Sequence, residues 1–294
     1  MRIFTGCACA LVTPFDAEGR LDAAALARLV RWHIGRGTDA LVVCGTTGEA
    51  STMTEREQAE AAANAVEAAD GRIPVIAGVG GNDTRRVIAA CKAARAAGAD
   101  GALAVTPYYN KTTQAGLIAH YHAIADSGVL PVMVYNVPAR TGLNIAPATL
   151  QAICRHENVI AVKEANPDVA QAIEKLRLCG EDVAFYSGSD ELNWPLMACG
   201  FQGVISVASN MLPRAVVELT EAALQGNVAE AARQQLALQP LISALFCETS
   251  PIPVKAAMAL LGQCEETVRL PLVPMQPEGR ARLEKVMRDM RLIV

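Results

Sequence analysis

A buried β-strand is indicated by the run Asn158-Val159-Ile160-Ala161-Val162-Lys163, whose central residues are all apolar and mostly β-branched. Similar short apolar runs recur along the 294-residue chain, with alanine-rich helical patterns between them. The runs that we predict as strands are Cys7–Val12, Ala40–Cys44, Pro74–Gly78, Gly101–Val105, Pro131–Tyr135, Val159–Lys163, Val183–Ser187 and Gly203–Val207. The helices between them are predicted near residues 22–36, 54–69, 83–97, 113–126, 147–155, 168–178 and 190–199.

Signals at the helix ends support this division. Thr54 is followed three residues later by Glu57, which is a capping-box pattern at a helix start. Several helical patterns end in a glycine, which suits the left-handed position after a helix. These glycines are Gly37, Gly71, Gly98 and Gly128.

Alternating strands and helices predict a parallel sheet, because each crossover between parallel strands needs a covering segment. Eight such units favour a closed (β/α)8 TIM barrel over an open doubly wound sheet. The open sheet would require a glycine-rich dinucleotide loop after the first strand, and residues 11–15 do not supply one. We therefore predict an α/β fold with the barrel in residues 1–212. Residues 213–294 are predicted to form a helical appendage of about four helices packed on the barrel.

Composition limits the possible classes of function. The formal net charge of −4, without a basic patch, argues against nucleic-acid binding. No apolar run of about 20 residues is available to span a membrane, and the first six residues lack the core of a signal peptide. The nine cysteines are scattered without a CxxC pair, which fits reduced thiols. We therefore expect a cytoplasmic protein with no nucleic-acid or membrane partner.

Lys163 is the first candidate for chemistry. Only six of the 26 basic residues are lysines, and this one ends an apolar strand. An apolar wall disfavours the charged form of lysine and lowers its pKa, which provides the neutral amine that Schiff-base chemistry requires. The alternative is a lysine that caps the strand and extends its amine to water.

Polar side chains follow several other predicted strands. In a barrel of parallel strands these ends meet at one face, where active sites lie. The segments at this face are Gly45-Thr46-Thr47-Gly48-Glu49, Thr106-Pro107-Tyr108-Tyr109-Asn110, Tyr135-Asn136-Val137-Pro138-Ala139-Arg140-Thr141-Gly142, Lys163-Glu164 and Ser187-Gly188-Ser189-Asp190. Their convergence favours the catalytic interpretation of Lys163.

Three of these segments have candidate roles of their own. The loop with Thr46 and Thr47 could hold a carboxylate or an oxyanion, or it could be a simple glycine turn. Tyr135 could reach the amine of Lys163 from the neighbouring strand, or it could be a half-buried structural tyrosine. Arg140 could bind a substrate carboxylate, or it could form a surface ion pair.

A metal or cofactor is not expected. The four histidines, at positions 33, 120, 122 and 156, fall on predicted helices or their ends, away from the strand ends. No histidine–carboxylate cluster is therefore predicted at the mouth of the barrel.

Five segments taken together resemble the dihydrodipicolinate synthase/N-acetylneuraminate lyase family of pyruvate-dependent aldolases, over residues 4 to 275 or so. They are residues 45–49, 106–110, 135–142, 162–164 and 203–207, in this order along the chain. The resemblance implies a Schiff-base aldolase without a cofactor, assembled as a homo-oligomer, in our expectation a dimer of dimers.

The resemblance also implies a role for each site residue. Lys163 would form an imine with pyruvate. The proton relay would consist of Tyr135, Thr46 and Tyr109, with Tyr109 reaching the site of a neighbouring subunit. The residues that would bind substrate are Thr47 for the pyruvate carboxylate, Arg140 for the carboxylate of aspartate semialdehyde, and Gly188 and Ile205 through their backbone groups.

The resemblance leaves the second substrate open. The Thr46-Thr47 pair and Arg140 resemble the branch that condenses pyruvate with aspartate semialdehyde in lysine and diaminopimelate biosynthesis. Residues 165–167 and Ser189 depart from the usual pattern of that branch. The alternatives are a related pyruvate-dependent lyase acting on a sugar acid or a hydroxyproline-derived keto acid, and a non-catalytic ligand-binding barrel.

Overall fold

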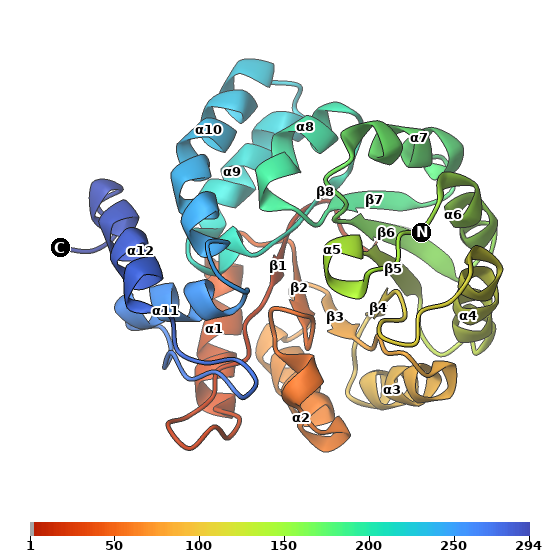
Figure 1. Cartoon of the computed structure of the whole chain (residues 1–294), viewed down its shortest axis with the longest axis horizontal. Helices are drawn as coiled ribbons and strands as arrows, with labels where there is room; N and C mark the ends of the chain where they lie inside the picture. The colour runs from red at the N-terminus through yellow and green to blue at the C-terminus, as the bar shows by residue number, and fades with distance from the viewer. Residues whose placement is uncertain (1–2) are drawn as a thin grey trace.

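The computed structural model describes residues 3–294, and its centre is a closed barrel of eight parallel strands that pair in sequence order. Figure 1 shows the strands at the centre of the molecule with helices around them. The strands are β1 (Gly6–Ala10), β2 (Ala40–Val43), β3 (Val75–Gly78), β4 (Gly101–Val105), β5 (Val132–Asn136), β6 (Val159–Glu164), β7 (Ala184–Ser187) and β8 (Gly203–Ser206). The predicted TIM barrel is therefore confirmed, and each strand lies within two residues of its prediction.

The outer layer of the barrel is helical. Its helices are α1 (Ala23–Gly35), α2 (Glu55–Ala69), α3 (Thr84–Ala96), α4 (Gln114–Asp126), α5 (Pro138–Thr141), α6 (Pro147–Cys154), α7 (Val169–Cys179), α8 (Asn193–Ala198) and α9 (Pro213–Leu224). The capping box at Thr54 and Glu57 is present at the start of α2. The four glycines predicted to follow helices all have positive φ angles, between 59° and 90°.

One predicted helix, at residues 190–199, is divided. It consists of a 3-10 turn, η2 (Asp190–Leu192), followed by the short helix α8. Pro195 lies near the start of α8 and has no N–H to donate to the carbonyl four residues earlier. A regular helix therefore cannot continue through this position with its full set of hydrogen bonds.

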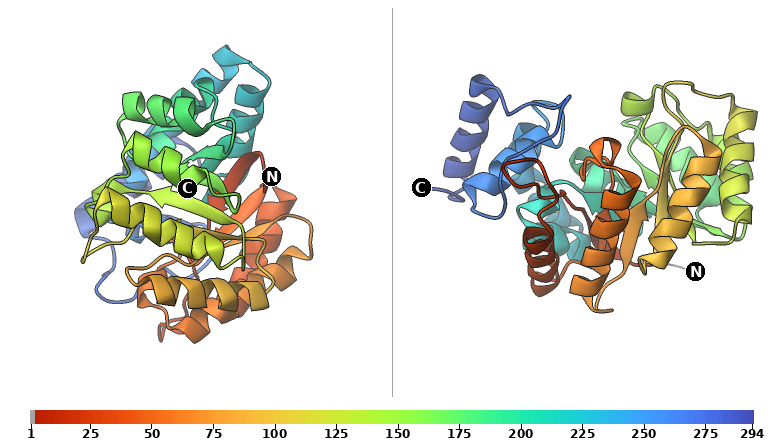
Figure 2. Two further views of the ribbon diagram at one scale, coloured as in Figure 1. Left: turned by 90° about the vertical axis from the view of Figure 1, so that its right-hand side faces the viewer. Right: turned by 90° about the horizontal axis from the view of Figure 1, so that it is seen from below.

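Four helices follow the last strand. Of these, α9 packs against β1 and β8, so it completes the ring of helices around the barrel. The remaining three are α10 (Val228–Leu245), α11 (Ile252–Leu260) and α12 (Pro277–Asp289). Figure 2 shows them beside the barrel, where α10 packs on α8 and α9. The contacts of α9 with β1 and β8 group this helix with the barrel. The predicted boundary after residue 212 would place it in the appendage. No helix among residues 3–294 is long and apolar enough to cross a membrane.

A charged pair is buried between the barrel and its helices. Lys175 of α7 and Glu164 at the end of β6 are both fully buried, with Nζ 2.7 Å from Oε2. Glu164 also accepts hydrogen bonds from the Asn136 side chain at 2.7 Å and the Asn166 main chain at 2.8 Å. Because Asn136 ends β5, this network joins the ends of two neighbouring strands.

We predict that Lys175→Met lowers the free energy of unfolding by about 3–5 kcal/mol, because it leaves the Glu164 carboxylate buried without its cation. Urea unfolding followed by circular dichroism measures the change. Lys285→Met is the matched control, because Lys285 forms an exposed ion pair with Asp289; it should change stability by less than about 0.5 kcal/mol. Equal effects of the two variants would contradict the prediction.

Candidate active site

The register of the barrel brings Tyr135 and Lys163 together. These residues are paired across β5 and β6, and consecutive side chains of a strand point to opposite faces. The Lys163 amine lies 4.4 Å from the centre of the Tyr135 ring. Both side chains are buried, with exposed fractions of 5% for Lys163 and 6% for Tyr135. The predicted proximity of the phenol and the amine is therefore present.

Burial of Lys163 changes its protonation. Loss of hydration lowers the pKa of its amine from 10.5 to about 8. The negative charge of Asp190 opposes this change, whereas the Arg140 cation adds to it. The neutral amine, which can attack a carbonyl carbon, is therefore far more abundant near neutral pH than it is for an ordinary lysine.

Gly188 leaves the space that the Lys163 side chain fills. A Cβ atom at this position would lie 2.9 Å from Cε of Lys163 and 3.0 Å from its Cγ. The Gly188 N–H donates to the Glu164 carbonyl at 2.7 Å, so the backbone cannot easily move away. Any side chain at residue 188 would consequently displace the amine.

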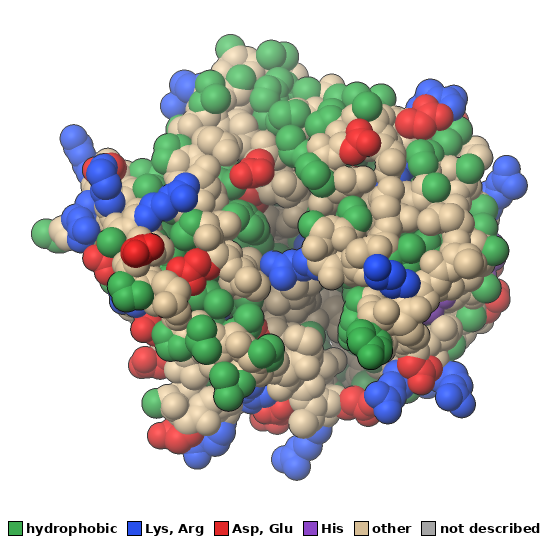
Figure 3. All heavy atoms as spheres, in the orientation of Figure 1, with side chains coloured by type: hydrophobic (Ala, Val, Ile, Leu, Met, Phe, Trp, Pro, Cys, Tyr) green, Lys and Arg blue, Asp and Glu red, His purple; other side chains and the backbone are tan. Residues whose placement is uncertain are grey.

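A cavity of about 450 Å³ opens beside Tyr135, and the face shown in Figure 3 is hollowed near its centre. Thr46 and Arg140 line this cavity together with Tyr135 and the neighbouring Tyr108. Lys163 does not border it directly but lies against the Tyr135 ring.

The Thr46 hydroxyl lies close enough to the Tyr135 phenol to influence its pKa. Burial raises the pKa of this phenol, although the Arg140 cation and the Thr46 hydroxyl oppose the rise. Tyr135 therefore stays protonated at neutral pH and can donate a proton along a short path through Thr46.

Arg140 lies on α5 at the edge of the same cavity. Its side chain is exposed, and one guanidinium nitrogen, Nη2, donates to the carbonyl of Ser250 at 3.2 Å. No carboxylate among residues 3–294 forms an ion pair with Arg140, so the surface ion pair considered from the sequence is absent from the described chain.

Besides Lys163 and Gly188, three further predicted site residues do not line the cavity. Thr47 is buried next to Thr46, and Ile205 is buried in β8. Tyr109 is 93% exposed in the single chain and has a φ angle of +67°, which is unusual for a bulky residue. Its side chain therefore lies away from Tyr135 of the same chain.

Asp190 contributes to the site, although the sequence placed it at this face without a role of its own. It is buried and accepts hydrogen bonds from the main-chain N–H groups of Val207 at 2.9 Å and Ala208 at 2.8 Å. Its charge raises the pKa of Lys163. The signal in the sequence is limited to a carboxylate that follows the seventh strand. The proximity of this carboxylate to Lys163 depends on how strands β6 to β8 close the barrel, which the sequence does not show.

The histidines lie where they were predicted. His33 is in α1, His120 and His122 are in α4, and His156 follows α6. Within the described part of the chain, no group of three or more His, Cys, Asp or Glu side chains is arranged to hold a metal ion.

Known proteins resemble the chain over nearly its whole length. The profile of the Dihydrodipicolinate synthetase family matches residues 3–290. A protein of Geobacter sulfurreducens named 4-hydroxy-tetrahydrodipicolinate synthase is 46% identical over 291 residues, covering 99% of this chain and 100% of the relative.

Solved structures agree with this result. The crystal structure of dihydrodipicolinate synthase from Aquifex aeolicus has a TM-score of 0.96 and 44% identity, covering 99% of both chains. That of dihydrodipicolinate synthase from Thermotoga maritima has a TM-score of 0.97 and 42% identity, covering 99% of this chain and 100% of that chain. The chain therefore belongs to the dihydrodipicolinate synthetase family.

Proposed function

We propose that the protein is a Schiff-base synthase that condenses pyruvate with aspartate semialdehyde to 4-hydroxy-tetrahydrodipicolinate, the first committed step of diaminopimelate and lysine biosynthesis. The observation that carries this proposal is the buried Lys163 amine, with its pKa lowered to about 8, against the phenol of Tyr135. The chain is also 46% identical, over its full length, to a protein that bears the name of this synthase.

The reaction begins at Lys163. Its neutral amine attacks the keto carbon of pyruvate, and loss of water gives an imine. Loss of a proton from the pyruvate methyl group then gives an enamine, whose carbon forms a bond to the aldehyde carbon of aspartate semialdehyde. The amino group of the second substrate attacks the imine carbon, which closes the ring and releases Lys163.

Tyr135 and Thr46 transfer protons during these steps, because the Tyr135 ring lies against the amine and both residues line the same cavity. Tyr109 completes the relay from a neighbouring subunit. Thr47 binds the carboxylate of pyruvate, and Gly188 and Ile205 line the same pocket with backbone groups. These roles come from the family pattern, and the positions of Tyr135 and Thr46 support them.

Arg140 selects the second substrate. Its guanidinium lies at the edge of the cavity without a carboxylate partner in the described chain and can bind the carboxylate of aspartate semialdehyde. Because this cation calls for an aldehyde that carries a carboxylate, we favour the synthase over the related lyases that act on a sugar acid or a hydroxyproline-derived keto acid.

The assembly that we propose is a homo-oligomer, a dimer of dimers, in the cytoplasm. Tyr108 is 39% exposed and the adjacent Tyr109 is 93% exposed in the single chain. Two neighbouring aromatic side chains on one loop are typical of a surface that is covered by a partner.

We predict that borohydride reduction in the presence of pyruvate attaches pyruvate to Lys163 and to no other lysine. Mass analysis of the peptide that contains residue 163 measures the adduct. Lys163→Arg should abolish it, because the arginine side chain is not deprotonated in proteins. An adduct on another lysine, or none in the unaltered protein, would refute the assignment.

The rate of this trapping should rise with pH to a plateau, with a midpoint near 8, the pKa to which burial lowers Lys163. Below this pH the amine is protonated and cannot attack. A midpoint near the ordinary value of 10.5 would show that the amine is fully hydrated.

We predict that Arg140→Ala lowers kcat/KM for aspartate semialdehyde by about 100-fold, the loss expected for a charge-assisted contact of about 3 kcal/mol. Imine formation with pyruvate should change by less than about threefold. It should be measured on the high-pH plateau, because the Arg140 cation also lowers the pKa of Lys163. Arg177→Ala, at an exposed ion pair of α7, is the matched control. Equal losses in both steps would indicate a structural role for Arg140.

We predict that the protein sediments as a tetramer at assay concentration. Tyr109→Ala should reduce condensation, and mixing it with Lys163→Arg should restore part of the activity, because each variant then supplies the group that the other lacks. A fully active monomer would contradict both the assembly and the role of Tyr109.

A further inference from the structure

The loop after β2 is attached to the appendage through Glu49. This loop carries Thr46 and Thr47, and Glu49 follows them with a φ angle of +54° and an exposed fraction of 3%. One carboxylate oxygen accepts a hydrogen bond from Nζ of Lys255 at 2.6 Å. The other accepts from the main-chain N–H of Arg269 at 3.0 Å. Both donors lie more than 200 residues later in the chain.

Lys255 is buried and contacts several segments of the chain. Its side chain, in α11, is fully buried, and its amine also donates to the Thr267 carbonyl at 2.6 Å. The amine lies 4.2 Å from the ring centre of Phe15, which belongs to the loop after β1. Loss of hydration lowers the pKa of Lys255, and the Glu49 carboxylate opposes this effect.

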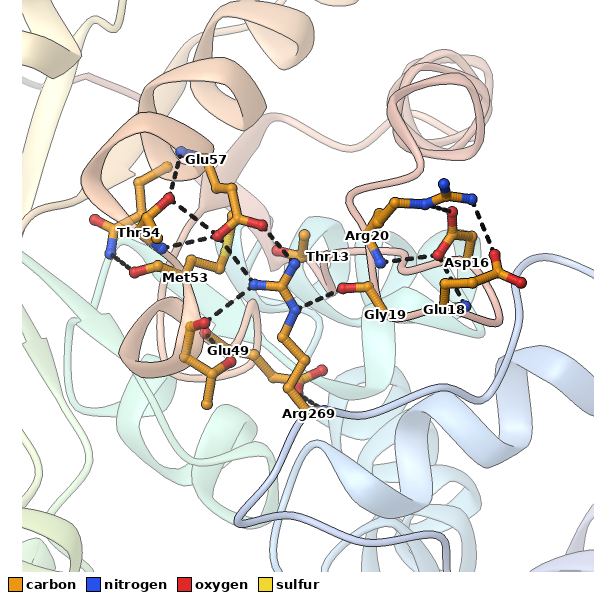
Figure 4. A network of polar contacts seen from close by, with 12 residues as sticks. Thr13, Asp16, Glu18, Gly19, Arg20, Glu49, Met53, Thr54, Glu57 and Arg269 are labelled. Carbon is orange, nitrogen blue, oxygen red and sulfur yellow. Dashed lines mark hydrogen bonds and ion pairs between the residues drawn. The ribbon is translucent and has the colours of Figure 1, made fainter.

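Arg269 joins the same loops from the other side. Its guanidinium donates to the carbonyl of Thr52 at 3.0 Å and to that of Gly19 at 2.8 Å, and it forms an ion pair with Glu57 of α2. Figure 4 shows the guanidinium between Glu57 and Gly19. Arg269 therefore links the loop after β1, the loop after β2 and the start of α2.

Stability alone gives little reason for this arrangement. Removing two charges from water costs several kcal/mol per ion, and replacing a buried ion pair by apolar side chains is often neutral or stabilising. The charged groups contribute directional hydrogen bonds, and each of these bonds fixes the position of one atom of the loop. Lys255 and Arg269 fix the Glu49 carboxylate, and the Arg269 guanidinium fixes the Thr52 carbonyl. The neutral Thr13 hydroxyl adds a third contact, to the Gly48 carbonyl at 2.6 Å.

We infer that Glu49, Lys255 and Arg269 are positioning residues for the condensation, through which the C-terminal appendage holds Thr46 and Thr47 in place. The inference rests on the proposed function, because Thr46 belongs to its proton relay and Thr47 is its carboxylate binder. The appendage also accepts the hydrogen bond of Arg140 at the Ser250 carbonyl, so residues 250–269 support two sides of the same cavity.

The test uses the full-length double variant Glu49→Gln/Lys255→Met. Both substitutions keep the approximate volume of the side chain and remove both charges, so no unpaired ion remains. We expect the variant to stay folded, with kcat for condensation lowered by about 10- to 100-fold, as for displacement of a catalytic group by about 1 Å. Lys285→Met, in the exposed ion pair of α12, should leave kcat unchanged.

A mutant cycle with Thr46→Val distinguishes positioning from a general structural role. If Glu49 and Lys255 act through Thr46, the double variant should cost less than about threefold in a chain that already lacks this hydroxyl. The pH midpoint of pyruvate trapping should remain near 8, because no contact of Lys163 is altered.

Arg269→Gln decides the matter if the double variant does not fold, because it retains the main-chain N–H that binds Glu49 and removes only the guanidinium contacts. It should lower kcat, and the loss should again disappear in the Thr46→Val background. A folded variant with unaltered kcat, or full additivity with Thr46→Val, would overturn the inference. Absence of condensation by the unaltered protein would instead refute the proposed function.

Discussion

Closure of the barrel between β1 and β8 is the constraint on which the site depends. The two strands are in register from Gly6, paired with Gly203, to Cys9, paired with Ser206. They approach so closely that a Cβ atom at residue 203 would lie 2.0 Å from the Gly6 carbonyl oxygen. Once the sheet is closed, all eight strands end at one rim. Closure alone therefore brings side chains that are far apart in sequence together at this rim.

Three of the six lysines are buried, and their partners separate structural from chemical roles. Lys175 and Lys255 each have a carboxylate within 2.7 Å. Lys163 forms no ion pair within the described chain and faces the Tyr135 ring instead. The nearby Asp190 directs its oxygens to N–H groups of other residues. Its charge thus acts on Lys163 only from a distance, and burial remains the larger influence on the pKa of the amine.

The sequence was sufficient for the barrel and for the pairing of Tyr135 with Lys163. Strands buried on both faces appear in the sequence as continuous apolar runs. Consecutive parallel strands are neighbours in a barrel, so their ends lie together. The role of Asp190 and the contacts of Glu49 could not be predicted in this way. They depend on hydrogen bonds between groups separated by 17 residues in one case and by more than 200 in the other, and no local pattern encodes such distances.

The boundary between barrel and appendage shows the same limit. A helix that covers β1 and β8 has the same amphipathic pattern as one that packs on another helix, so the sequence could not tell that α9 belongs to the ring. The contacts of residues 250–269 make a sharp division less meaningful still. Arg140 donates to this segment, and Glu49 accepts from it. A barrel rim is open to solvent on one side, and its longest loops have no neighbouring strand to hold them. In this chain the appendage provides contacts of this kind, and through Glu49 and Arg140 it supports the segments that line the cavity.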